Sequence, residues 1–312
     1  MTAGHGHGHG HAHDHGLTAT GQYRGRLAMV LGITVTIAVG EVIGAVLTGS
    51  LVLLADAGHM AADAAGVGLS LLAAYFASKP ATERRTFGYA RLEILAATVN
   101  ALLLFGIAGF IMVEAARRLM TPEPVNAGLM AVFGAIALAG NATSLLLLRG
   151  AQAESLNARG AFLEVASDAF GACAVLVTAA VVATTGFTRI DAAASLAVGA
   201  LILPRTWRLL RDAVDVLLEA SPQGVDLTQV RQHLTGLDGV LDVHDLHAWT
   251  ITSGLPVLSA HVVVDAAALA GGCGPGILDR LQACLHGHFD VAHSTFQLEP
   301  SGHADHEPSV HD

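Results

Sequence analysis

The chain carries little charge for its length. Asp, Glu, Lys and Arg make up 13% of its 312 residues, whereas a soluble domain carries about 25%. Hydrophobic residues account for 53% of the chain, and the mean hydropathy is +0.55. This composition excludes an ordinary soluble fold and indicates a chain that crosses a membrane several times. The net charge of −10 offers no basic surface, so we expect no nucleic-acid partner.

Cysteine is also scarce. The three cysteines, Cys173, Cys273 and Cys284, form no C-x-x-C pair, so the sequence indicates neither a disulfide framework nor a Cys-type zinc site. Cys173 lies in an apolar segment, where packing is its simplest role. The N-terminus is rich in Gly and His, and the first apolar segment is too long for a cleavable signal peptide, so we expect none.

Six apolar segments are long enough to cross a bilayer as helices, which takes about 20 residues. They lie near residues 26–48, 51–77, 93–117, 127–148, 158–184 and 188–209. With six spans, most arginines fall on one side of the membrane. The other side holds Arg117, Arg118 and Arg189, with Glu114 and Glu123 partly offsetting the first two. The positive-inside rule then predicts a multi-pass membrane protein with both termini in the cytoplasm.

The regions outside these spans differ in composition. Residues 1–22 alternate His with Gly and are expected to be a disordered tail, for which we favour weak metal capture over no role. A six-helix transmembrane domain is assigned to residues 23–210 and an amphipathic connector to 211–221. Residues 222–300 follow as a separate domain, and residues 301–312 as a second disordered tail.

The segment 222–300 shows a mixed pattern. Helical periodicity covers residues 225–237 and 275–289, and strand patterns cover 239–252, 255–265 and 292–299. The order αββαβ within roughly 80 residues predicts a small α+β sandwich. The fold class is therefore an all-α six-helix transmembrane domain plus a cytoplasmic α+β domain.

Ionisable residues stand inside two of the apolar segments. His59 and Asp63 are four residues apart, as are Glu164 and Asp168, so each pair projects from one face of its helix. A charged side chain within the membrane costs at least ~2.5 kcal/mol and needs a partner. One nitrogen and three carboxylates suit a tetrahedral site for a cation such as zinc. The alternative is two unrelated buried salt bridges, which is weakened because neither helix holds a basic residue beyond Arg159 at the very start of the second.

Two further acidic residues stand in the apolar segments. Glu41 either lines a water pathway or hydrogen bonds across helices. Asp56, one turn from His59, either guides cations from the outer side or caps a neighbouring helix. We do not assign Asp56 as a ligand.

A second group of metal-ligating residue types falls on the predicted strands. His244 and His261 lie on successive strands and Glu299 on the last. Antiparallel neighbours would bring such side chains within reach of one ion. The alternative is surface histidines on a half-exposed sheet, and spacing alone leaves both open. His286 and His288 are less favoured candidates.

Several longer motifs make the chain recognisable. They are GSLVLLADAGHMAAD, RRTFGYARLEILAATVNA, SLNARGAFLEVASDAFGA, and VHDLHAWTITSGLPVLSAHVVV with HSTFQLE. Together they resemble the cation diffusion facilitator family of zinc and other divalent-cation transporters, bacterial zinc-efflux type, over about residues 23–300. The resemblance implies six transmembrane helices in the cytoplasmic (inner) membrane, a cytoplasmic ferredoxin-like domain and a homodimer that exchanges metal for protons.

The resemblance also implies site residues. The HxxxD motif that zinc-selective members carry on helices two and five matches His59, Asp63 and Asp168, but Glu164 stands where the usual residue is His. The set then holds one nitrogen, so zinc is less clearly preferred over cadmium, cobalt, manganese or iron. The cytoplasmic metal site of some members matches His244, His261 and Glu299. In those members a His from the neighbouring N-terminal segment sometimes completes the cytoplasmic site. In this chain the His-rich tail would supply that ligand.

The sequence thus favours a proton-coupled exporter of divalent metal, most of all zinc, that moves the ion through His59, Asp63, Glu164 and Asp168. Its partners would be metal ions, protons, the lipid bilayer and a second copy of the chain, with no prosthetic group. The alternatives are a cadmium, cobalt, manganese or iron exporter, an intramembrane metalloenzyme, or a metal sensor or buffer. We expect no enzyme, because no H-E-x-x-H motif occurs and four protein ligands leave no place for activated water.

Overall fold

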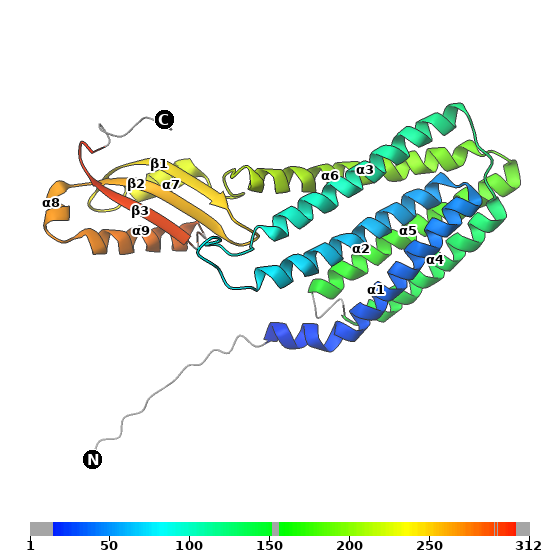
Figure 1. The fold of residues 1–312 in the computed structure, drawn as a ribbon, viewed down its shortest axis with the longest axis horizontal. Helices are drawn as coiled ribbons and strands as arrows, with labels where there is room; N and C mark the ends of the chain where they lie inside the picture. Colours follow the sequence, from blue (N-terminus) through cyan, green and yellow to red (C-terminus); the bar gives the residue numbers. More distant parts are fainter. Residues whose placement is uncertain (1–14, 152–155, 290, 292, 304–312) are drawn as a thin grey trace, which may run out of the picture. The chain divides into compact units, whose positions relative to one another are not determined.

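The computed structural model describes residues 15–151, 156–289, 291 and 293–303. Six long helices come first, and a small mixed domain follows (Figure 1). The helices are α1 (His15–Thr48), α2 (Leu51–Ala77), α3 (Leu92–Met120), α4 (Ala127–Leu148), α5 (Leu156–Thr185) and α6 (Arg189–Leu217). The chain divides into two compact units, residues 1–65 with 103–206 and residues 66–102 with 207–312.

Five of the six helices begin within two residues of the predicted positions. The exception is α1, which begins at His15, inside the tail predicted to be disordered. Adding a residue to an existing helix gains one hydrogen bond, so an apolar helix can extend into a segment that would not nucleate one. The histidines before residue 15 lie outside the described part of the chain. At the other end, α6 continues to Leu217, so the first part of the predicted connector is helical.

Within the described residues, five helices are long and apolar enough to cross a membrane by length and composition. The helix that falls short is α6, the sixth span expected from the sequence. Its apolar run is brief, because Asp191 stands near its beginning and Pro204 and Arg205 stand near its middle. The helical membrane region therefore comprises five clearly apolar helices and a more polar sixth.

The helices of the first unit pack through small residues. A Cβ on Gly44 of α1 would lie 2.6 Å from the Phe133 ring of α4, and one on Gly140 of α4 would lie 2.6 Å from Ile37 of α1. Such contacts let two helix backbones approach closely. The buried cluster around Val52 of α2 joins the same helices to α5.

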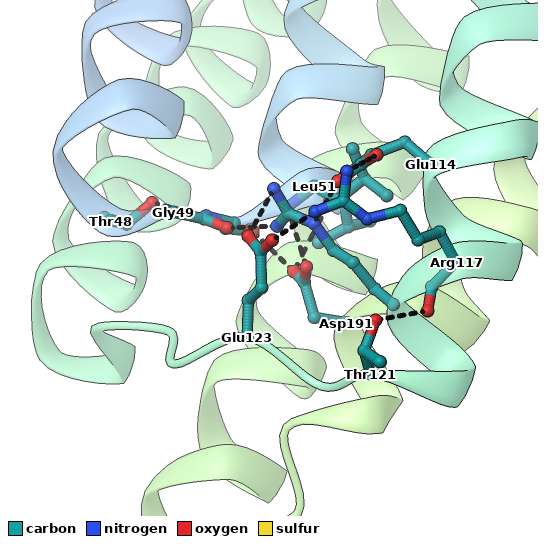
Figure 2. A network of polar contacts seen from close by, with 11 residues as sticks. Thr48, Gly49, Leu51, Glu114, Arg117, Thr121, Glu123 and Asp191 are labelled. Atoms are coloured by element: carbon teal, nitrogen blue, oxygen red, sulfur yellow. Dashed lines mark hydrogen bonds and ion pairs between the residues drawn. The ribbon is translucent and has the colours of Figure 1, made fainter.

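Asp191 at the start of α6 holds the beginning of α2 (Figure 2). Its carboxylate accepts hydrogen bonds from the Ser50 hydroxyl (2.5 Å) and from the amides of Leu51 (2.7 Å) and Val52 (3.3 Å). The first amides of a helix have no partner within the helix, and a negative charge is favourable at this end of the helix dipole. Asp191 is only 1% exposed. It therefore acts as a buried cap supplied by a distant helix.

The two arginines at the end of α3 are neutralised by acidic neighbours, and Figure 2 shows Arg117 with Glu114 and Glu123. Arg118 pairs with Glu114 and with Glu123, both at 3.0 Å, and donates a hydrogen bond to the carbonyl of Gly49 at 2.6 Å. Arg117 pairs with Glu123 at 3.2 Å. The expectation that the two glutamates offset these arginines is confirmed.

The C-terminal domain contains the predicted helices and strands. They are α7 (Leu227–Thr235), β1 (Val240–Thr250), β2 (Pro256–Val264), α8 (Ala266–Ala270), α9 (Gly274–His288) and β3 (His293–Pro300). The short helix α8 adds to the expected order αββαβ. The sheet runs β1-β2-β3, and one buried core joins it to α7 and α9. This is the α+β ferredoxin-like arrangement expected from the sequence.

The sheet differs from expectation in one respect. β1 and β2 are antiparallel, but β2 and β3 are parallel, whereas we had assumed antiparallel neighbours around the histidines. The connection between β2 and β3 contains α9, which returns the chain to the edge of the sheet where β2 begins. β3 starts at that edge and therefore runs in the same direction as β2. The pairing places His261 beside Gln297 and Val263 beside Glu299.

Candidate metal centres

A stripe of polar residues runs along the facing sides of α2 and α5. Residues three and four positions apart share one face of a helix, and both helices follow this spacing. The six positions are Asp56, His59 and Asp63 on α2 and Glu164, Asp168 and Gly171 on α5. The steps are three and then four residues on α2, and four and then three residues on α5. Two antiparallel helices with these spacings place each position of one opposite a position of the other.

Three of the four predicted membrane ligands meet toward one end of this stripe. The Nε2 atom of His59 lies 3.2 Å from Oδ2 of Asp63. A carboxylate oxygen of Glu164 joins them, so that one ligand atom from each residue lies within 4.8 Å of the other two. The three side chains are half-buried. A single cation between the helices can therefore reach all three.

Asp168 lies one turn farther along α5 and is outside this group of three. It is 4% exposed, its charge acts on the carboxyl group of Asp63, and the charge of Glu164 acts on Asp168 in turn. Its Oδ1 atom and the Nδ1 atom of His59 are buried and have no hydrogen-bond partner among the described residues. Each such atom costs about 1–3 kcal/mol to bury, and a bound cation or its water would supply the missing partner.

The stripe continues to a second pair of buried acids. Asp56 of α2 is 5% exposed and Glu41 of α1 is 1% exposed, and the two carboxyl groups lie close enough to interact. Both oxygens of Glu41 are buried, and the side chain with which Glu41 can hydrogen bond is that of Asp56. The alternatives considered from the sequence, a polar pathway and a contact or cap between helices, both stay predictions.

One basic residue acts on the membrane cluster, which the sequence argument had overlooked. Arg205 of α6 exerts an electrostatic effect on both His59 and Asp63. The search for basic residues had covered only the two ligand-bearing helices, whereas Arg205 comes from a third. Its side chain is exposed, so water screens much of its charge, and it does not replace a cation between the carboxylates.

The second predicted group also comes together. His244 and His261 are direct partners across β1 and β2. Glu299 of β3 lies between them, with Oε2 at 3.1 Å from His244 Nε2 and Oε1 at 2.8 Å from His261 Nδ1. The Glu299 side chain is almost fully buried, whereas the two histidines are about one quarter exposed. Two imidazoles and one carboxylate within reach of one ion suit zinc.

Residues that the sequence argument did not select surround this group. Gln297 donates a hydrogen bond to Glu299 Oε1 at 2.7 Å. Asp245 lies 2.9 Å from His247 Nε2 and 3.7 Å from His261 Nε2. Asp245 has a positive φ of 47° and occurs where the register between β1 and β2 shifts. A bulge of this kind re-aims side chains, and the sequence gives little sign of it.

Long apolar helices with buried imidazole and carboxylate groups, joined to a small α+β domain, are the architecture of a membrane transporter for cations. Comparison with known proteins narrows this class. The family model for the cation efflux transmembrane domain matches residues 27–218, and the model for the cytoplasmic domain of cation efflux proteins matches residues 222–301. The chain therefore belongs to the cation efflux family, whose members are membrane transporters and not enzymes. The resemblance to the cation diffusion facilitators is confirmed.

Curated relatives agree with this assignment. The metal cation efflux system protein CzcD of Cupriavidus metallidurans is 41% identical over 88% of this chain and 85% of its own. The zinc transporter ZitB of Escherichia coli is 38% identical over 88% and 87%. The cadmium, cobalt and zinc/H(+)-K(+) antiporter of Bacillus subtilis is 36% identical over 84% and 85%. The similarity thus extends through both parts of the chain, and the protein is a multi-pass membrane protein.

Proposed function

We propose that this protein exports a divalent metal cation, zinc foremost, in exchange for protons. The observation that carries the proposal is the convergence of His59, Asp63 and Glu164 between two membrane helices, with one ligand atom of each within 4.8 Å of the others. The names of three relatives, which refer to metal cation efflux, zinc transport and antiport of cadmium, cobalt and zinc, support the substrate class.

The separations between the ligand atoms are close to those of an occupied tetrahedral zinc site. Zinc binds nitrogen and oxygen at ~2.0–2.2 Å, which sets tetrahedral ligands about 3.4 Å apart. The three ligand atoms lie within 4.8 Å of each other and need only a small contraction. Asp168 is buried one turn away on the same helix face, and we propose that it completes the set as the fourth ligand. The ion would then connect α2 and α5 directly.

Proton exchange follows from the ligand types. A carboxylate or imidazole must lose its proton before it binds metal, so metal and protons compete for the same atoms. A site that opens to the more acidic side therefore reloads with protons and releases the ion. The acidic pair Asp56 and Glu41 extends the stripe, and we propose that it attracts the cation along its route. The alternating exposure would come from movement of the helices against each other.

The C-terminal domain would report metal concentration to the transporter. We propose that His244, His261 and Glu299 bind the same ion on the cytoplasmic side, that both termini are cytoplasmic, and that two chains assemble as a homodimer. Metal binding at this sheet would favour one arrangement of the dimer and so bias transport. The bounds proposed for the transport domain remain 23–210, and those for the cytoplasmic domain 222–300.

The test is zinc flux in proteoliposomes with an imposed proton gradient. Wild-type protein should move zinc against its gradient and release protons in the opposite direction. Asp63→Ala and Asp168→Ala should each lower the flux at least about tenfold, because loss of even a supporting group at a metal site costs 10–100-fold. The control is Asp279→Ala, which removes an exposed carboxylate from α9.

Two results would reject parts of the proposal. Full flux in either ligand variant would remove that residue from the site. Tight zinc binding without flux would instead indicate a sensor or buffer. Parallel measurements with cadmium, cobalt and manganese identify the preferred metal.

A further inference from the structure

A third group of metal-ligating side chains lies on the helical side of the C-terminal domain. His233 is in the last turn of α7, and Cys284 and His288 are four residues apart on α9. One ligand atom from each residue lies within 4.8 Å of the other two. No motif in the sequence joins these residues, because His233 and Cys284 are separated by the entire β-hairpin.

This group is separate from the histidines of the sheet. Cys284 packs in the core with Val243 and Val262. Neighbouring residues of a strand point to opposite faces, so His244 and His261, next to these valines, face away from the helices. One ion cannot serve both groups.

One ring nitrogen of His288 is held by the helix backbone. Its Nδ1 atom lies 3.0 Å from the carbonyl oxygen of Cys284. A carbonyl can only accept a hydrogen bond, so Nδ1 carries the proton and the Nε2 lone pair is left for an ion. Metal-binding histidines almost always donate their other ring N–H in this way.

Aromatic rings and burial restrict how the side chains of His233, Cys284 and His288 can move. The rings of His233 and His288 have their centroids 5.0 Å apart, and Phe289 covers His233 with its centroid at 5.2 Å. Cys284 is 8% exposed, while both histidines are exposed. Burial raises the pKa of the Cys284 thiol, so the metal must displace a proton to bind sulfur. The site is thus accessible from the histidine side and dry around the sulfur.

We propose that His233, Cys284 and His288 form a third metal site, which takes a thiophilic divalent cation such as Zn²⁺ or Cd²⁺ and clamps α7 to α9. The donor set supports this choice, because thiolate with imidazole selects softer ions than carboxylates do. A fourth position remains for water. The site goes beyond the transport function and does not depend on it. The competing possibility is a ring cluster that packs without metal.

The experiment uses Co²⁺ as the probe and the full chain in detergent. A Co²⁺–thiolate bond gives a near-ultraviolet charge-transfer absorption that imidazole and carboxylate ligands do not give. The whole chain has three cysteines, so Cys173→Ser with Cys273→Ser leaves Cys284 as the sole thiol. The transport site, the sheet site and the His-rich N-terminal segment then contribute no such band.

With Co²⁺ in excess of all metal-binding groups of the chain, the sole-thiol protein should show the band at the intensity of one thiolate per chain, and Zn²⁺ or Cd²⁺ should abolish it. His233→Ala and His288→Ala should each weaken Co²⁺ binding at least about tenfold. His286→Ala, which removes an exposed histidine from the same helix, and His244→Ala should leave the band unchanged. Absence of the band in the sole-thiol protein, or a band unaffected by both His233→Ala and His288→Ala, would overturn the proposal. Zinc flux measured in the same variants separates this outcome from a failure of the transport function.

Discussion

Asp56 of α2 lies directly against the backbone of Gly171 on α5. A Cβ on Gly171 would be 2.3 Å from Oδ1 of Asp56 and 3.0 Å from its Cγ. The glycine therefore leaves the space that a buried carboxylate fills, one turn beyond Asp168 on the stripe proposed as the transport route. Real Cβ atoms do not come this close, so any other residue at position 171 must displace Asp56 or separate the helices.

Gly171→Ala should therefore lower zinc flux at least about tenfold and destabilise the protein, since overpacking a tight contact costs about 1–3 kcal/mol. The matched control is Gly160→Ala on the same helix, where a Cβ meets no atom within 4 Å. Alanine there should be neutral or stabilising by up to about 1 kcal/mol. Flux in proteoliposomes and thermal unfolding in detergent measure both effects. Equal behaviour of the two variants would show that Asp56 yields without consequence.

Asp191→Ala should destabilise the membrane region. The substitution removes the acceptor of three hydrogen bonds from Ser50, Leu51 and Val52. Each buried donor left without an acceptor costs about 1–3 kcal/mol of stability. Asp191→Asn keeps one acceptor oxygen and should have a smaller effect. Thermal unfolding in detergent provides the comparison. If Asp191→Ala unfolds at the wild-type temperature, the cap is not important for stability.

Glu164→His should raise the flux of zinc relative to manganese. Imidazole suits zinc, whereas carboxylate suits manganese, and the variant changes the set from one nitrogen to two. Glu164→Asp keeps the carboxylate and serves as the control for altered size. The measurement is competitive flux of the two metals in proteoliposomes. A ratio unchanged by the histidine would mean that residue 164 does not contact the ion.

Cys284 should react slowly with alkylating reagents in metal-free protein. Burial raises the pKa of its thiol above the usual range, so at pH 7 less of it is in the reactive thiolate form. Cys273 is exposed and provides the comparison in a Cys173→Ser background. Iodoacetamide labelling of Cys284 should be at least about tenfold slower at pH 7 and should still be rising at pH above ~8.5, the usual thiol pKa. Equal rates would show that the thiol is accessible and unperturbed.

The local pattern of the chain already determined much of this protein. Apolar length predicted the beginnings of α2 to α6 closely, because a helix that spans a membrane must satisfy its own backbone and needs a fixed number of residues. The i, i+4 spacing of His59 with Asp63 placed two ligands on one face without knowledge of any neighbour. Strand alternation likewise identified His244 and His261 as candidates for one site.

Tertiary structure alone decided the remaining relationships, because they join segments whose separation in sequence carries no periodic signal. The cap that Asp191 places on α2, the charge of Arg205 near His59, and the meeting of His233 with Cys284 all depend on how whole elements pack. The same is true of β3, whose parallel direction follows from the return of α9 and not from its own residues. Periodicity shows which face of an element is polar, and only packing determines which other face it meets.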